Sequence, residues 1–213
     1  MPSSTAISAQ GSTLSVSGGA GVVKNITGLA LGFPTIVASA AHGFSNGDIV
    51  TFGALAGNTT LNGQTAVIKN VTAGTYAVDI DTTGGAAWTA GGTATPVAWT
   101  PIGNLNNFKG FDGTANEIDK TNLSSTAKEF MLGLQDFGHF TFDVDKDFTD
   151  PGQVACDAAK RAGTLKQFKL TLPNTRTATF SGYVKNSPLD GGVDQILKTT
   201  GVSIRITGDV AYA

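Results

Sequence analysis

The sequence predicts an all-β fold with one α-helix, and three observations support this class. Charged residues make up only 14% of the 213 residues, while glycine is abundant at 28, which is typical of short strands joined by many turns. Apolar residues recur at every second position in several segments, as with Phe140, Phe142 and Val144. Clear helix start and stop signals are concentrated in 150–163. We therefore expect a β-sandwich or closed barrel with a single packed helix.

The distribution of charge divides the chain into two modules. Residues 26–95 contain only four charged side chains, whereas 12 of the 14 basic and 13 of the 16 acidic residues lie from residue 96 onward. Such a step in composition indicates module boundaries near residues 25 and 96. We expect a discontinuous body formed by 1–25 and 96–213, with 26–95 as an inserted domain.

The inserted stretch is predicted to form a small β-barrel or sandwich. Asn46-Gly47 in "HGFSNGDIVTF" supplies the positive φ angles of a tight hairpin turn, and "LNGQTAVIKNV" offers a second Asn-Gly turn. Alternation in "TYAVDIDT" separates two faces, with Tyr76, Val78 and Ile80 on one and Ala77, Asp79 and Asp81 on the other.

This module resembles the FCCH-type β domain, which is known from ubiquitin-activating enzymes and occurs as an insert in many phage structural proteins. The residues that carry the resemblance are "VASAAHGFSNGDIVTF", "LNGQTAVI" and "DIDTTGGAAWTAGGTA". No ubiquitin chemistry follows, because such a module carries none on its own. We expect His42, which lies among turn-like neighbours, to be structural and not catalytic.

The body is predicted to consist of strands on either side of one helix. Strands are expected at 104–111 and 116–123. The helix is expected to be capped by Asp150, to begin at Pro151 and to end at Gly163. Gln153 completes an Asp-x-x-Gln capping box, and the apolar stripe is predicted to contain Val154, Ala155, Ala158 and Ala162. The side chains predicted to be buried in the later strands are Phe168, Leu170, Leu172, Ala178, Phe180, Gly182, Val184, Val202, Ile204 and Ile206.

Several patterns suggest chemistry, but each has a plainer interpretation. Asp143, Asp145, Asp147 and Asp150 resemble a calcium loop, yet the glycine and glutamate that an EF-hand requires are absent. We interpret the run as a solvated strand edge leading into a helix cap. His139 and Asp143 share the polar face of a strand, but no nucleophile elbow, zinc cluster, phosphate loop or dinucleotide fingerprint is present. Cys156 is expected to be a buried packing residue. We therefore expect no enzyme activity, cofactor or metal.

The segment "EIDKTNLSSTAKEFMLGLQDFG" connects two predicted strands. Thr126 to Glu129 form a Thr-x-x-Glu capping box, which predicts a short helical turn that Gly133 stops. An apolar cluster follows, formed by Phe130, Met131, Leu132 and Leu134. Apolar side chains on an exposed connection are costly for a monomer. We expect a neighbouring subunit to cover them; the alternative is that the loop folds back on its own domain.

The chain resembles the tail tube (major tail) proteins of long, flexible-tailed, siphovirus-type bacteriophages. "EIDKTNLSSTAKEFMLGLQDFGHFTFDVD" is similar to the signature of that family. "FKLTLPNTRTATFSGYVKN" and "GVSIRITGDV" match its Leu-Pro, Phe-x-Gly and Ile-Thr-Gly positions. The resemblance covers 96–213 well and 1–25 loosely, and the inserted domain departs from it.

This resemblance implies a tail-tube-type β-sandwich or barrel body. Its copies would form hexameric rings that stack into a tube, the conduit for DNA ejection into the host. The partners implied are other copies of the chain and tape measure, tail tip and tail terminator proteins. DNA would pass through without specific binding, and no membrane would be involved. The location implied is the virion tail, after assembly in the host cytoplasm, with the inserted domain outside the tube. The predicted inter-subunit contact residues are Glu117, Ile118, Asp119, Thr121, Phe130, Met131, Leu132, Leu134 and Asp136; Asp143 and Asp145 are the candidates for facing the lumen.

Charge and targeting signals agree with this expectation, although two other functions stay open. A net charge of −2 lacks the basic footprint of a protein that grips DNA. No secretory signal or bilayer-spanning run is expected from the sequence. The first alternative is a carbohydrate-binding adhesin module, suggested by Trp88 and Tyr76. The second is the tube protein of a contractile or type VI-like injection system.

Overall fold

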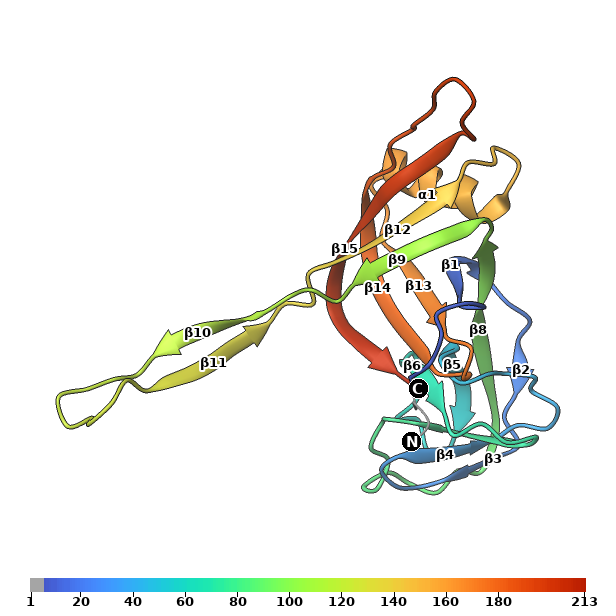
Figure 1. Ribbon diagram of the computed structural model, residues 1–213. Coiled ribbons are helices and arrows are strands. Elements are labelled where there is room, and N and C mark those ends of the chain that lie inside the picture. The colour runs from blue at the N-terminus through green and yellow to red at the C-terminus, as the bar shows by residue number, and fades with distance from the viewer. Residues whose placement is uncertain (1–5) are drawn as a thin grey trace, which may run out of the picture. The chain divides into compact units, whose positions relative to one another are not determined.

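The computed structural model describes residues 6–213, which divide into two compact units (Figure 1). Of the described residues, the first contains 6–102, Gln167–Thr179 and Ala211–Ala213, and the second contains Gly103–Lys166 and Phe180–Val210. Residues 1–5 of the predicted body lie outside the described residues. The chain is nearly all antiparallel strands with one helix in the described part, so the predicted fold class is confirmed.

The first unit is an antiparallel arrangement in the order β3-β4-β7-β6-β5-β8-β1-β13, with β2 paired to β8. Its interior is a continuous apolar cluster that includes Val37, Phe52, Leu61 and Tyr76. The strands are β1 (Thr13–Ala20), β2 (Lys24–Asn25), β3 (Gly28–Ala30), β4 (Thr35–Ala38), β5 (Ile49–Ala56), β6 (Thr65–Lys69), β7 (Thr75–Val78), β8 (Ala90–Ile102) and β13 (Lys166–Thr171).

Strand β8 joins the predicted insert to the predicted body. Its first half pairs with β5, where Phe52 lies opposite Ala94, and its second half pairs with β1, where Leu14 lies opposite Ile102. The predicted boundary at residue 96 therefore falls inside a strand. The insert and part of the body also share one compact unit. The division into two domains stays a prediction.

Two local predictions for the insert are wrong. Gly47 has the expected positive φ of +82°, but the turn at Asn46-Gly47 does not close a hairpin, because β4 pairs with β7 while β5 pairs with β6 and β8. Ala77 is buried together with Tyr76 and Val78, because β7 lies between β4 and β6 inside the small barrel.

The second unit contains a four-stranded antiparallel sheet in the order β14-β15-β12-β9. Alternation along β12 is as predicted, with Phe140, Phe142 and Val144 buried. Phe140 also contacts Phe111 and Phe180 at ring-centroid distances of 5.5 and 5.0 Å, which builds an aromatic core. The elements are β9 (Leu105–Gly110), β10 (Ala115–Asp119), β11 (Phe130–Gln135), β12 (His139–Asp145), α1 (Pro151–Ala162), β14 (Thr177–Asn186) and β15 (Lys198–Tyr212). The residues of β14 up to Thr179 and those of β15 from Ala211 are assigned to the first unit.

Helix α1 begins and ends where the sequence predicts. The Asp150 carboxylate accepts a hydrogen bond from the Gln153 N–H at 2.7 Å, and Gly163 adopts the left-handed conformation with φ of +62°. The reciprocal half of the capping box is missing, because the Gln153 side chain turns toward the preceding loop. Its Oε1 accepts from the Asp147 N–H at 3.0 Å, and its Nε2 donates to the Asp145 carbonyl at 3.0 Å.

The predicted apolar stripe of α1 is wrong. Val154 is 43% exposed, and Ala158 and Ala162 are exposed as well. Anchoring of Gln153 to the loop turns a different face of the helix inward. The buried residues are Gly152, Gln153, Cys156 and Ala159.

Candidate functional site

The segment predicted to be a long loop is a β-hairpin, which we call the arm (residues 112–138). Strands β10 and β11 pair antiparallel, with Ile118 opposite Met131 and Asp119 opposite Phe130. In Figure 1 these two strands extend away from the sheet of their own unit. The predicted strand over 116–123 is β10, which ends earlier, at Asp119.

The predicted helical turn at Thr126 to Glu129 does not form. The backbone of Glu129 pairs across the hairpin instead: its carbonyl accepts from the Lys120 N–H at 3.0 Å, and its N–H donates to the Thr121 hydroxyl at 2.9 Å. These bonds occupy the groups that a first helical turn would use. Gly133 accordingly lies inside β11 and ends no helix.

The hairpin tip is held by its own side chains. The Asp119 carboxylate accepts from the Thr121 N–H at 2.8 Å. The hydroxyl and the backbone N–H of Thr121 together hold the pKa of Asp119 below its usual value. Asp119 is therefore negatively charged at neutral pH on an exposed part of the arm.

The arm has one face that combines acidic and apolar side chains. Residues opposite each other in an antiparallel pair point to the same side, and Glu117 lies opposite Leu132 as Asp119 lies opposite Phe130. Leu134 lies two residues beyond Leu132 in β11, where the register of the pair shifts. These side chains are exposed: Leu132 by 71% and Leu134 by 91%. We call Glu117, Asp119, Phe130 and Leu132, together with the adjoining exposed Leu134, the acidic-apolar face.

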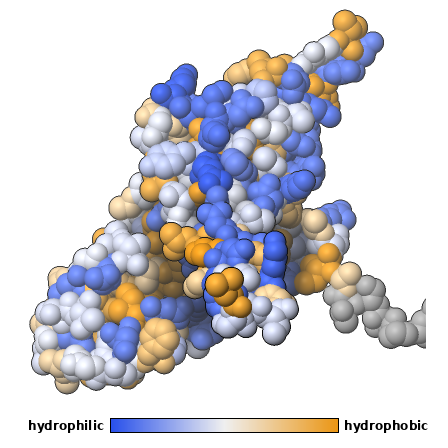
Figure 2. Space-filling view, turned by 90° about the vertical axis from the view of Figure 1, so that its left-hand side faces the viewer, coloured by the Kyte–Doolittle hydropathy of each residue, from blue (hydrophilic) through white to orange (hydrophobic). Residues whose placement is uncertain are grey.

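The opposite face of the arm is smaller. It carries Ile118 and Met131, which are 48% and 52% exposed. Figure 2 views the side from which the arm extends, and hydrophobic side chains appear near its centre, beside strongly hydrophilic ones. Both faces of the hairpin thus offer apolar surface to solvent in this single copy.

The root of the arm is tightly built. The Asp112 carboxylate accepts from the His139 N–H at 2.8 Å, and the Asp136 carboxylate accepts from the Gly138 N–H at 2.8 Å. Asp136 also forms an ion pair with Arg205 of β15 at 2.5 Å. The backbone N–H of Gly138 and then Arg205 hold the pKa of Asp136 below its usual value. These hydrogen bonds and the ion pair hold both strands of the arm where they leave the sheet.

The predicted contact residues fall into two groups. Eight of the nine, all except Asp136, lie in β10, β11 or the tip and have exposed side chains. Asp136 lies at the root and binds Arg205 within its own chain. Their role as inter-subunit contacts stays a prediction.

The aspartates that suggested a calcium loop have separate tasks. Asp143 accepts from the Gly201 N–H at 2.6 Å, and Asp145 accepts from the Asn106 amide at 2.7 Å. Asp147 binds Thr149 and Asp150 caps α1. Within residues 6–213, no group of three or more His, Cys, Asp or Glu side chains is placed to hold a metal ion. Asp143 and Asp145 lie on the face of β12 opposite its buried phenylalanines, and their place in a lumen stays a prediction.

The remaining residues considered for catalysis or binding are His42, Cys156, Tyr76 and Trp88, and their contacts are structural. His42 is buried, and its Nδ1 accepts from the Phe44 N–H at 3.0 Å, so the ring proton lies on Nε2, which donates to the Thr72 carbonyl at 3.0 Å. Burial raises the pKa of the Cys156 thiol to about 12. Tyr76, one of the two residues that suggested a carbohydrate-binding module, is fully buried and has no ring surface open to a ligand. The indole N–H of Trp88 donates to the Gly91 carbonyl at 2.9 Å.

The fold and the arm define an all-β chain with a small barrel near its beginning and an exposed hairpin in its second unit. A family model described as the ubiquitin-activating enzyme E1 FCCH domain matches residues 32–98. This match fits the FCCH-like domain predicted for 26–95 and covers less than half of the chain. Among curated proteins, none is similar enough to match.

Among residues 6–213, no helix is both long enough and apolar enough to cross a membrane.

Proposed function

We propose that this chain is a structural subunit that polymerises as stacked hexameric rings into a siphovirus-type phage tail tube, the conduit for DNA ejection. The observation that carries the proposal is the acidic-apolar face, where Phe130, Leu132 and Leu134 are at least half exposed. The sequence resemblance of 96–213 to tail tube proteins supplies the kind of assembly.

Exposure of this face is energetically unfavourable for a lone molecule. Full burial of one leucine or phenylalanine side chain contributes roughly 1.5–3 kcal/mol. A two-stranded hairpin is also marginally stable by itself in water. Contact with another copy would remove the apolar side chains from water and support both strands of the arm. Self-assembly would therefore lower the free energy of this exposed surface.

The sheet of the second unit also supports assembly. Strand β9 ends the strand order of that sheet, so its outer backbone groups can pair with a further strand. Such pairing around a ring uses one edge of each copy against a different surface of the next, and it closes when the rotation between copies is correct. A hexameric ring would satisfy these edges.

The chemistry of a DNA passage suits this chain. Phosphates bind tightly to surfaces rich in lysine and arginine, so a lumen for fast transit should be neutral or acidic. Asp143 and Asp145 would supply negative charge if the polar face of β12 lines the bore. The inserted domain would decorate the outside. Tape measure, tail tip and tail terminator proteins would be the remaining partners, in a virion tail assembled in the host cytoplasm. The proposal requires no catalytic site.

Sedimentation velocity of the purified full chain tests the proposal. The double variant Leu132→Ser/Leu134→Ser should remain monomeric at concentrations where the wild type forms rings or larger polymers. Leu123→Ser is the matched control, because Leu123 is fully exposed at the hairpin tip and lies outside the acidic-apolar face. Equal self-association of the double variant and the wild type would contradict the role of this face, and a wild type that stays monomeric would contradict the proposed function.

A further inference from the structure

We propose that a basic, apolar-walled pocket beside α1 receives the acidic-apolar face of the arm of a second copy. This inference rests on the proposed function and names the surface that the arm would contact. The pocket and the arm belong to the same unit of each chain, so every copy would carry both halves of the contact. Such a head-to-tail contact suits a repeating assembly.

The pocket is formed by four separate segments of the second unit, the loop before α1, α1 itself, 187–189 and Thr199 of β15. It has a volume of about 260 Å³ and is open to solvent. Pockets for small ligands commonly measure about 300–1,000 Å³, so this one better suits one or two protein side chains. The side chains that define its walls are Lys146, Phe148, Lys160, Arg161, Pro188 and Leu189.

The floor of the pocket is electrically balanced. Lys146 forms an ion pair with Asp157 at 2.6 Å, and only 6% of the Lys146 side chain is exposed. The Asp157 carboxylate also accepts from the Ser187 hydroxyl at 2.8 Å. Burial opposes the charge of Asp157, but the hydrogen bonds from Lys146 and Ser187 outweigh it and lower the pKa of that carboxyl.

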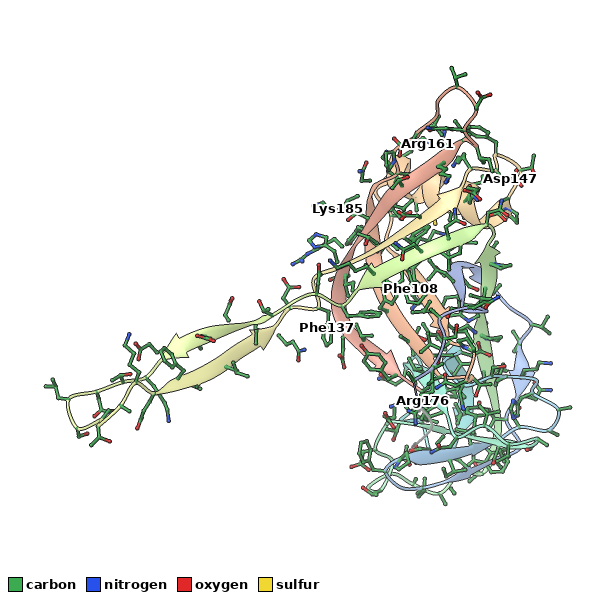
Figure 3. All side chains as sticks on the ribbon, in the orientation of Figure 1. Phe108, Phe137, Asp147, Arg161, Arg176 and Lys185 are labelled. Carbon is green, nitrogen blue, oxygen red and sulfur yellow. The ribbon has the colours of Figure 1, made fainter. Side chains whose placement is uncertain are left out.

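The rim of the pocket carries positive charge. Lys160 and Arg161 lie in the last turn of α1, and Lys160 Nζ donates to the Ser187 carbonyl at 3.4 Å. Within the part of the chain that the structure describes, neither side chain forms an ion pair with a carboxylate. Figure 3 shows Arg161 beside α1, at the end of the unit away from the arm.

The rim also carries exposed apolar side chains. Basic residues in the last turn of a helix stabilise the helix end, but this role does not account for apolar side chains beside them. Phe148 is 63% exposed and Leu189 is 57% exposed. Large apolar side chains beside cations form a surface complementary to one on which large apolar side chains stand beside carboxylates. The acidic-apolar face is such a surface, with Glu117 and Asp119 next to its phenylalanine and leucines.

A charge-exchange experiment tests the contact. We expect Glu117→Lys and Arg161→Glu each to raise the concentration needed for polymerisation of the full chain by about tenfold, because each change brings like charges together. The double variant Glu117→Lys/Arg161→Glu should restore polymerisation to near the wild-type concentration. Lys128→Glu on the arm and Arg176→Glu in the first unit are matched charge-reversal controls.

Disulfide cross-linking tests the same contact by a method that does not depend on charge. Leu132→Cys and Leu189→Cys are prepared as separate proteins, mixed, allowed to assemble and oxidised, while buried Cys156 stays protected. We expect a disulfide-linked dimer between the two variants. In the control, Leu132→Cys is mixed with Tyr183→Cys. Tyr183 lies on β14 and is 44% exposed, and this mixture should give no disulfide-linked dimer.

The outcomes separate this contact from the proposed function. Polymers that form normally with Arg161→Glu, or a Glu117→Lys/Arg161→Glu variant that is not rescued, would overturn the pocket as the receiving surface and leave self-assembly intact. A wild-type chain that never polymerises would overturn both. Circular dichroism of each variant establishes that a loss of assembly is not a loss of folding.

Discussion

The Asp136 carboxylate lies 2.5 Å from the Arg205 guanidinium, and this ion pair ties the root of the arm to strand β15. Arg205 also sits directly opposite His139 in the β12–β15 ladder, so the pair joins the exit of the arm to the centre of the sheet. The orientation of the acidic-apolar face relative to its own sheet depends on this root.

The first prediction concerns this ion pair. Both side chains are more than a third exposed, at 39% and 46%, so Arg205→Gln should lower the free energy of unfolding only slightly. The arm should nevertheless become more mobile, since its root loses one anchor. Hydrogen exchange of the amides in 115–135 should speed up while exchange in β14 stays unchanged. Unchanged exchange in the arm would show that the ion pair does not control it.

The second prediction concerns the glycines at the root. A side chain on Gly113 would overlap the Asp136 carbonyl and the backbone of Gly138, so Gly113→Ala should destabilise the unit by about 2 kcal/mol. Gly133→Ala is the control, because its added methyl group would meet the Asn116 carbonyl only at 3.3 Å. Urea denaturation compares the two variants. Equal urea midpoints for the two variants would mean that the backbone around Gly113 can accommodate a methyl group without loss of stability.

The third prediction concerns acid stability. The pKa of Asp157 is lowered in the folded chain, so its charge contributes stability above the unfolded pKa of about 3.9, and this contribution is lost as the pH falls through the folded pKa. The free energy of unfolding should therefore fall between about pH 5 and pH 2. Asp157→Asn should flatten that fall and lower stability at pH 7. A variant with the wild-type pH profile would contradict the assignment.

The fourth prediction concerns the link between the insert and strand β13. Asp48 and Lys169 form an ion pair at 2.6 Å whose side chains are only 14% and 12% exposed. Asp48→Ala should cost about 3 kcal/mol, because it removes the carboxylate that balances the charge of the buried Lys169 and leaves only the Trp99 ring beside the ammonium group. The double variant Asp48→Ala/Lys169→Met should be more stable than Asp48→Ala alone. If the double variant is the less stable of the two, the cost does not come from an unpaired charge.

The same ion pair bears on removal of the insert. If the insert decorates the outside of a tube, assembly should not require residues 26–95 themselves. The deletion removes strand β5, which pairs with β8, and it removes Asp48, which pairs with Lys169. Because Lys169 would lose its carboxylate partner, we expect the deleted chain to assemble only when it also carries Lys169→Met. Electron microscopy of both deletion variants checks this expectation, and failure of the compensated variant would contradict the decoration hypothesis.

Much of the fold could be predicted from local patterns. Period-two alternation located the buried side of β12 and β15, and the Asp150 and Gly163 signals located both ends of α1. These signals are reliable because they act within a few residues of the chain. The FCCH-like module was likewise recognisable from contiguous residues.

The errors arose where distant residues decide the outcome. The capping signal at Thr126 was overridden by pairing of Lys120 with Glu129 across the hairpin, which no local pattern shows. The buried face of α1 depends on Gln153, a polar residue that contacts the loop before the helix. The basic pocket was missed because its lining comes from four segments that meet only in the folded unit.

Electron microscopy of the purified wild-type chain over a range of rising concentrations would show whether copies of the chain assemble with one another. We expect rings that stack into hollow tubes, with a bore wide enough for duplex DNA. Particles that remain single molecules at the highest soluble concentration, with the arm free in solvent, would contradict it.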